Sequence, residues 1–133
     1  MSEHTPGPWV LDTIQTSVGI CHRIGPFPPR RPDDETVRHA CLYADYPSAC
    51  NPADKELEAN ARLIAAAPDL LTALVSVVEN AKQRAFEDWL QRVSPSGDVD
   101  AVHAQWLESG EFLEFTESWA VQLDAIDKAQ VKP

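Results

Sequence analysis

Glycine is scarce in this 133-residue chain, which contains only five. The sequence has no G-x-x-x-x-G-K-[ST], G-x-G-x-x-G, G-x-S-x-G or H-E-x-x-H motif, so the common phosphate-binding loops and hydrolase signatures are excluded. No two carboxylates stand out by spacing as a catalytic pair, and none of the four histidines lies beside an obvious nucleophile. We therefore expect a protein that is not an enzyme and that needs no cofactor.

Cysteine and long apolar runs are scarce too. The three cysteines are an odd number, which favours free thiols over a disulfide framework. The first residues lack the basic start and the apolar core of a signal peptide. No apolar run approaches the roughly 20 residues that a membrane span needs. These absences predict a cytoplasmic protein without a membrane segment.

Basic residues are few: 11 against 21 acidic ones, a formal net charge of −10. A broad nucleic-acid-binding surface needs clustered Lys and Arg, so we expect no direct binding of nucleic acid. Residues 79–133 carry eleven of the acids and five of the bases. Such acidity serves solubility, or it imitates nucleic acid toward a basic partner, and composition leaves both uses open.

Apolar residues make up 44% of the chain and charged residues 24%, which is typical of a globular protein. We predict a single domain, 1–133, with a β-meander at 1–50, a helix at 51–93 and further helices at 98–130. The meander has about three strands, near Trp9–Leu11, Thr16–Ile24 and Thr36–Tyr46.

A proline-rich loop interrupts the predicted meander at residues 25–35. Four prolines in seven residues remove backbone donors from Pro26–Pro32, which excludes a helix or a central strand there. Long loops inside compact domains are often functional, and a plain strand connector is the alternative.

The strongest helix pattern follows this loop. Asn51 suits an N-cap and Pro52 the first helical position, and apolar residues then recur at spacings of three and four. Pro68 lacks an N–H group, so the helix kinks or restarts there and continues to about Val93. The fold class is therefore α+β: a short antiparallel meander covered by a Pro68-kinked helix.

An acidic helical region ends the chain. Residues 94–98 form a clear break, and Val99–Ser109 is a short helix candidate. One further amphipathic helix is expected, because aromatic and apolar side chains recur at three and four at Phe112, Phe115, Trp119, Leu123 and Ile126. Its acids offer a partner-binding surface made of Glu111, Glu114, Glu117 and Asp124. Packing on the earlier helices is the first interpretation of this segment, and pairing with a partner or with another copy of the chain is the alternative.

The leading candidate site lies in the one basic interval of the chain. Guanidinium groups bind phosphate and aromatic rings stack on bases, so this interval suits a small phosphorylated ligand. The predicted ligand-binding residues are Arg30, Arg31, Arg38, Phe27 and Tyr43. Simple neutralisation of the neighbouring acids Asp33, Asp34 and Glu35 is the alternative.

Cysteine and histidine residues form a weaker constellation. His39 and Cys41 share one face of the third predicted strand, where they would join Cys21 or Cys50 around zinc. No C-x₂-C pair is present, and the neighbours Cys21 and His22 point to opposite faces of a strand. We therefore expect buried thiols and no metal.

Two segments resemble a widespread group of small phage and prophage proteins. They are His4–Trp9, with the wording HTPGPW, and Glu58–Leu74, which begins EANARLIAAAPDLL. The resemblance implies the fold typical of this group, a short meander followed by this helix. The sequence departs from the group in the proline–arginine loop and in the acidic region after Gly97. The layout also resembles the Thoeris anti-defence sponge family, whose oligomers sequester cyclic nucleotide signals.

These resemblances imply a phage or prophage accessory protein, active in counter-defence in the cytoplasm of the host cell. The leading expectation is sequestration of a small phosphorylated, cyclic nucleotide-type signal by a homo-oligomer. An anti-CRISPR-type inhibitor, whose acidic helices block a nucleic-acid-binding effector, is the alternative. A third reading is a dimerising accessory protein without a ligand.

Overall fold

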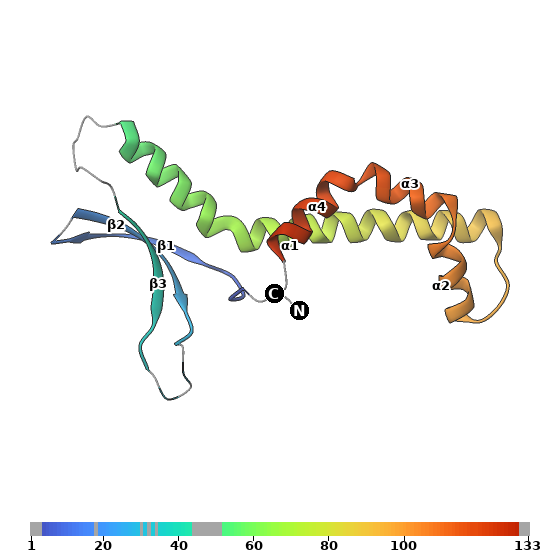
Figure 1. Cartoon of the computed structure of the whole chain (residues 1–133), viewed down its shortest axis with the longest axis horizontal. Helices are drawn as coiled ribbons and strands as arrows, with labels where there is room; N and C mark the ends of the chain where they lie inside the picture. The colour runs from blue at the N-terminus through green and yellow to red at the C-terminus, as the bar shows by residue number, and fades with distance from the viewer. Residues whose placement is uncertain are drawn as a thin grey trace. The chain divides into compact units, whose positions relative to one another are not determined.

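The computed structural model describes residues 4–17, 19–29, 31, 33, 35–43 and 52–130, and for residues 52–54 only the backbone. Three strands precede four helices in the chain (Figure 1). The strands are β1 (Val10–Thr16), β2 (Gly19–Phe27) and β3 (Arg38–Tyr43); the helices are α1 (Pro52–Val93), α2 (Val99–Leu107), α3 (Gly110–Ser118) and α4 (Ala120–Ala129). This confirms the predicted α+β class.

The chain divides into two compact units. The first is Glu3–Leu70, which contains the sheet and the first part of α1. The second contains Leu71–Pro133, with the rest of α1 and the three shorter helices. Helix α1 thus supplies residues to both units, and each unit is described separately below.

The sheet is an antiparallel meander in the order β1-β2-β3, as predicted. Thr13 pairs with His22 across the first hairpin, and Cys21 pairs with Tyr43 across the second. The prediction that residues 25–27 lie outside a central strand is wrong, because β2 continues to Phe27. Its register with β3 shifts between Ile24 and Phe27, and this bulge accommodates a proline that cannot donate a ladder hydrogen bond.

Gly25 makes the bulge possible. Its φ angle of +157° lies where side chains are disfavoured, and a Cβ atom there would lie 2.8 Å from Cδ2 of His39. The glycine–proline pair that indicated a loop in the sequence therefore belongs to the sheet.

The core of the first unit lies between the sheet and α1. Ile24, Ala61 and Ala65 are buried together, and Trp9, Leu11, Phe27 and Leu42 pack against them. The small alanines let the helix approach the strands closely. Figure 1 shows this first part of α1, in green, lying beside the three strands. The predicted cover of the meander by this helix is confirmed.

The residues before β1 pack on α1. A Cβ atom on Gly7 would lie 2.7 Å from Cβ of Pro68, so the two backbones come too close for a side chain at this position. The indole N–H of Trp9 donates to the Thr5 carbonyl at 3.0 Å, and the Trp9 ring meets Phe27 edge-on at 5.4 Å. The two segments that carry the phage resemblance are thus in contact with each other.

Pro68 lies inside α1. No second helix begins at Asp69, because residues on both sides of the proline belong to one helix. Proline cannot donate the hydrogen bond that would reach the Ile64 carbonyl, so this position costs α1 one internal bond. The buried Pro68 ring packs against the Gly7 segment instead.

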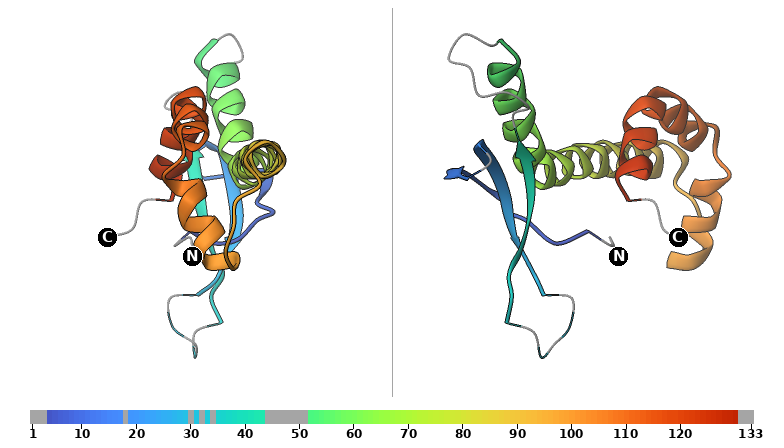
Figure 2. Two further views of the ribbon diagram at one scale, coloured as in Figure 1. Left: turned by 90° about the vertical axis from the view of Figure 1, so that its right-hand side faces the viewer. Right: turned by 60° about the vertical axis from the view of Figure 1, so that its left-hand side comes forward.

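The second unit has an aromatic core. Trp106 of α2 is 1% exposed and lies between Trp89 of α1, with ring centroids 5.6 Å apart, and Phe112 of α3, at 5.5 Å. Phe115 continues the cluster along α3, and Trp119 extends it. Figure 1 and both views of Figure 2 show α3 running alongside the second part of α1.

The segment predicted as one helix around residues 112–126 is two helices. The backbone leaves helical geometry at Trp119, with φ −107° and ψ 20°, and α4 begins at the next residue. No proline or glycine marks this break. The aromatic spacing survives because the Trp119 ring stays 6.3 Å from Phe115.

Candidate functional surfaces

The predicted arginine site lies where the loop between β2 and β3 leaves the sheet. Phe27 ends β2 and Arg38 begins β3, and the two are register partners. The Arg38 Nε–H donates to the Pro28 carbonyl at 2.7 Å, which holds the guanidinium at the start of the connecting loop. Arg31 in that loop is exposed, whereas Arg30 lies outside the described residues. The structure thus brings Phe27 and Arg38 together.

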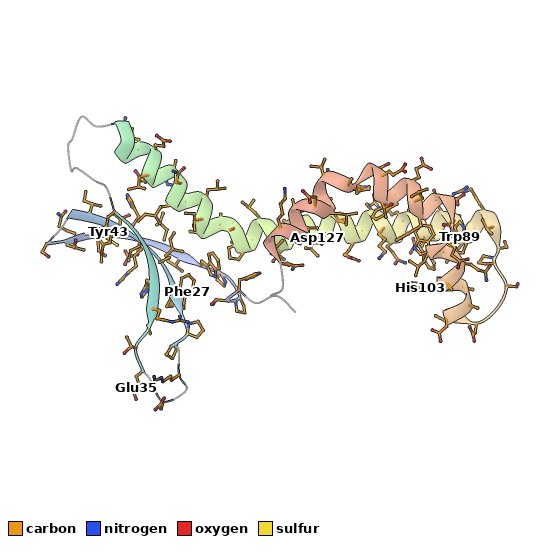
Figure 3. All side chains as sticks on the ribbon, viewed as in Figure 1. Phe27, Glu35, Tyr43, Trp89, His103 and Asp127 are labelled. Carbon is orange, nitrogen blue, oxygen red and sulfur yellow. The ribbon has the colours of Figure 1, made fainter. Side chains whose placement is uncertain are left out.

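Neither aromatic residue of the predicted site offers a free ring beside these arginines. Phe27 packs on the sheet–helix core and against Trp9. Tyr43 is 47% exposed, but it lies five residues beyond Arg38, about 16 Å along a strand. Figure 3 shows the labelled Phe27 and Tyr43 at separate places on the sheet. A shared base-stacking site for both rings would need a rearrangement of the sheet.

A fourth residue of the basic interval, Arg23, is engaged within the sheet. Its Nη2 atom donates to Asp12 Oδ2 at 2.7 Å across the β1–β2 pair. Its Nε atom is buried without a hydrogen-bond partner among the described residues. This arginine therefore serves the sheet, and its charge is already matched.

Two thiols meet on the sheet. The prediction of buried thiols is confirmed for Cys21 on β2 but is wrong for Cys41 on β3, which is exposed. A hydrogen bond to Cys21 raises the pKa of the Cys41 thiol. The same Cys21 thiol raises the pKa of the Tyr43 hydroxyl. His22 is buried and shares a 3.0 Å hydrogen bond through Nδ1 with Thr13 Oγ1. His22 and its neighbour Cys21 thus have different partners: His22 bonds to Thr13, whereas Cys21 contacts Cys41 and Tyr43.

Zinc ligation is not set up in the described part of the chain. No group of three His, Cys, Asp or Glu side chains gathers there in a way that could hold a metal. Cys50, the third cysteine, lies outside the described residues.

The predicted acidic residues lie on α3 and α4. Glu111 accepts from Arg92 at 3.3 Å, and Asp124 accepts from Lys128 at 2.9 Å, so two of the four are paired. Glu114 and Glu117 are exposed and form no ion pair among the described residues. These two side chains are the unneutralised part of the predicted surface.

A shallow groove of about 330 Å³ runs between α1 and α3 beside these acids. It combines apolar walls with charged rims, a composition typical of a surface that binds another macromolecule. Its lining comprises Ala81, Ala85, Asp88, Arg92, Glu111, Glu114, Phe115, Ser118 and Trp119. Sequence reasoning identified Glu111 and Glu114 of this lining but missed Asp88 and the α1 wall, because it predicted packing on the earlier helix without specifying which residues of that helix lie beside the acids.

A second groove, of about 630 Å³, lies between the end of α1 and α2. Its lining is mainly apolar, with Phe86 and Leu90 from one helix and Val99 and Val102 from the other. His103 also lines it, and Figure 3 labels this residue on α2. Sequence reasoning missed the groove entirely, although the alternating aspartates and valines of residues 98–102 mark its rim.

Helix α1 is also long and apolar enough, by length and composition alone, to cross a membrane. Between Lys55 and Val93 an 18-residue window has a mean hydropathy of 1.7, and 17% of it is buried. Arg62 and Asp69 interrupt its apolar residues, so the sequence shows no long apolar run there. Its Ala61 and Ala65 are part of the sheet–helix core, as expected for a helix of a folded unit.

A known protein family matches the chain. The family model described as Salmonella phage P22 protein Y8K6 matches residues 1–132, nearly the whole chain. No curated protein and no solved structure matches the chain.

Proposed function

The chain belongs to the family of Salmonella phage P22 protein Y8K6, and from this premise we propose that it is a non-catalytic accessory protein that binds a host protein in the cytoplasm. Membership supports a phage protein, as the sequence resemblance implied. The step from phage protein to counter-defence factor is the proposal, and the surface chemistry below supports it.

The exposed acids of α3 carry this proposal. Glu114 and Glu117 lie one turn apart on a helix whose opposite side is the aromatic core of the second unit. The two unpaired carboxylates attract a basic surface, and the groove with aromatic walls, which Glu114 lines, then gives that surface apolar contact. A preformed helix presents both charges without the entropic cost of ordering the backbone on binding.

The partner class that fits is a nucleic-acid-binding effector of a host defence system, as in an anti-CRISPR-type inhibitor. Such effectors carry clustered Lys and Arg for phosphate contacts. A protein of net charge −10 associates with the basic surface of such an effector faster than a neutral protein does. Its binding weakens as salt screens the charges.

An infection assay tests this function. Host cells with an active CRISPR–Cas or other nucleic-acid-targeting defence system express the protein and are infected with a targeted phage. We expect plaque numbers to recover. With the purified effector, the protein should inhibit DNA binding, and inhibition should weaken between about 50 and 300 mM NaCl.

The decisive variant is Glu114→Gln/Glu117→Gln, which removes two charges and little volume. We expect about a tenfold loss of inhibition. The matched control, Glu56→Gln/Glu87→Gln, removes two exposed charges from α1 and should inhibit like wild type. Equal inhibition by both double variants would refute the role of α3.

Sequestration of a small phosphorylated, cyclic nucleotide-type signal remains a second candidate. One observation favours it: Arg38 is held at the loop start beside Phe27, with Arg31 exposed in the same loop. In this function Arg30 and Tyr43 would complete the site, and the protein would be a homo-oligomer.

Native mass spectrometry with cyclic dinucleotides tests the second candidate and also reports the number of subunits. A mass increase of one ligand per subunit, lost in Arg31→Ala/Arg38→Ala, would support it. The control Arg84→Ala removes an arginine from the other unit and should leave binding intact. Unchanged binding in the double variant would rule out the arginine site.

A further inference from the structure

The groove between the end of α1 and α2 has a composition that differs from the rest of the second unit. Its walls are apolar side chains, whereas its rim carries the carboxylates of Asp98 and Asp100. Neither Lys nor Arg occurs among the described residues that line it. Val99, between the two aspartates, is 84% exposed, so an apolar side chain stands in water beside two negative charges.

The two rim aspartates have different structural roles. Asp98 caps α2, because its Oδ1 accepts the Ala101 N–H at 2.9 Å. Asp100 lies in the first turn of the same helix and is exposed. Neither carboxylate has an ion-pair partner among the described residues, so both charges face solvent at the mouth of the groove.

We propose that this groove binds a peptide segment of a partner protein in which an apolar side chain is flanked by Lys or Arg. The apolar side chain enters between Phe86, Leu90 and Val102, where water is displaced from carbon surface on both partners. The flanking cation pairs with Asp98 and Asp100 at the rim. A volume of about 630 Å³ accommodates one or two large side chains.

The charge of the groove favours this basic peptide over other ligands that carry an apolar group. A fatty acid or an acidic peptide would bring a negative charge to a rim that already holds two. A neutral apolar ligand would gain nothing from the two carboxylates, which are exposed and hydrated. The surrounding residues 79–133, with eleven acids and five bases, favour the same basic partner.

This inference deepens the proposed function, because it names the chemistry of a partner segment and a second contact surface for it. It differs in site: the proposed function depends on Glu114 and Glu117 of α3, whereas the peptide site depends on α2 and the end of α1.

Fluorescence anisotropy with a labelled synthetic peptide tests the groove. The probe is a peptide of about twelve residues built from leucine and lysine, and its counterpart carries glutamate at every lysine position. We expect saturable binding of the lysine peptide and none of the glutamate peptide. Equal binding of both peptides would overturn the proposal.

Two matched pairs of variants separate this site from general attraction to an acidic protein. Asp98→Asn/Asp100→Asn removes the rim charges, and asparagine keeps the α2 cap. Glu56→Gln/Glu87→Gln removes two charges elsewhere. Val99→Gln makes the groove wall polar, and Val121→Gln does the same to a valine on α4 that is 79% exposed.

The rim variant and Val99→Gln should each weaken peptide binding by about tenfold, whereas both controls should stay within about twofold of wild type. Equal weakening by the two charge variants would show non-specific attraction and overturn the proposal. Because the assay contains no effector, its failure leaves the proposed function standing, and that function is tested separately by Glu114→Gln/Glu117→Gln.

Discussion

Gly7 has no room for a side chain, although it lies in a turn before the first strand. A Cβ atom at this position would approach Cβ of Pro68 to 2.7 Å, and both atoms belong to segments whose backbones are held by packing. We predict that Gly7→Ala lowers the free energy of unfolding by about 1–3 kcal/mol, because the turn must move away from α1. Urea unfolding followed by circular dichroism measures this change.

Gly110 supplies the control for this substitution. It begins α3, and nothing lies within 4 Å of a Cβ atom there. Gly110→Ala should be neutral or should stabilise by up to about 1 kcal/mol, since alanine suits a helix better than glycine. If Gly7→Ala unfolds at the same urea concentration as wild type, the contact with Pro68 does not restrict the turn.

The Cys41 thiol gives a prediction in pH. Its hydrogen bond to Cys21 raises the pKa of Cys41, which disfavours the reactive thiolate. Alkylation of Cys41 should therefore require a higher pH than alkylation of a free thiol. Cys21→Ala removes the partner and should shift the midpoint of the rate profile down. Peptide mass spectrometry resolves Cys41 from Cys50, and an unchanged midpoint in the variant would show that the hydrogen bond has no effect.

The raised pKa of Cys41 also makes the stability of the folded state depend on pH. A thiol whose pKa is raised by folding binds its proton more tightly in the folded state than in the unfolded chain. This contribution is fully present below the ordinary thiol pKa of 9.0 and is lost as the pH rises through the raised value. Alkaline conditions above pH 9 should therefore reduce the stability of the first unit.

Among the secondary-structure elements, α3 depends on a cap that the sequence analysis did not identify. Ser109 Oγ accepts the Phe112 N–H at 3.1 Å and donates to the Trp106 carbonyl at 2.6 Å, so one side chain ends α2 and starts α3. We predict that Ser109→Ala lowers the free energy of unfolding by about 1 kcal/mol. Thermal unfolding of the whole chain provides the measurement.

Two further variants interpret the result for Ser109. Ser109→Asp retains an acceptor at the cap and should recover most of the stability. Ser76→Ala removes an exposed serine from the middle of α1, where alanine is the better helix former, and should not destabilise. A loss in Ser76→Ala as large as that in Ser109→Ala would contradict the capping role.

At the same scale, the elements differ in how well the sequence predicted them. The meander and α1 follow from β-branched residues, helix formers and the Asn–Pro start, all of which are local. The bulge at Gly25 was missed because it depends on pairing with β3, which is not local. The break at Trp119 was missed because no helix-breaking residue is present and the aromatic spacing continues through it.

The whole molecule carries a net charge of −10, and its 21 acids repel one another at low salt. We predict that raising NaCl from about 10 to 200 mM increases the melting temperature by about 2–5 °C, because screening reduces this repulsion. Salt also weakens the four ion pairs of the described residues, but every paired side chain is at least a third exposed, and such pairs contribute little stability. Differential scanning fluorimetry measures the effect, and a falling melting temperature would show that attractive pairs dominate.

The sequence by itself determined the fold class, the order of the elements and the phage resemblance, because these depend on local patterns and on short sequence motifs. Its candidate ligand-binding residues are not all neighbours: Phe27 and Arg38 meet, whereas Tyr43 lies at the other end of β3. Only the tertiary structure decided which side chains pack in the core, which acids are paired and where grooves form. Those features arise from contacts between residues distant in the chain, and no periodicity within one element specifies its partner.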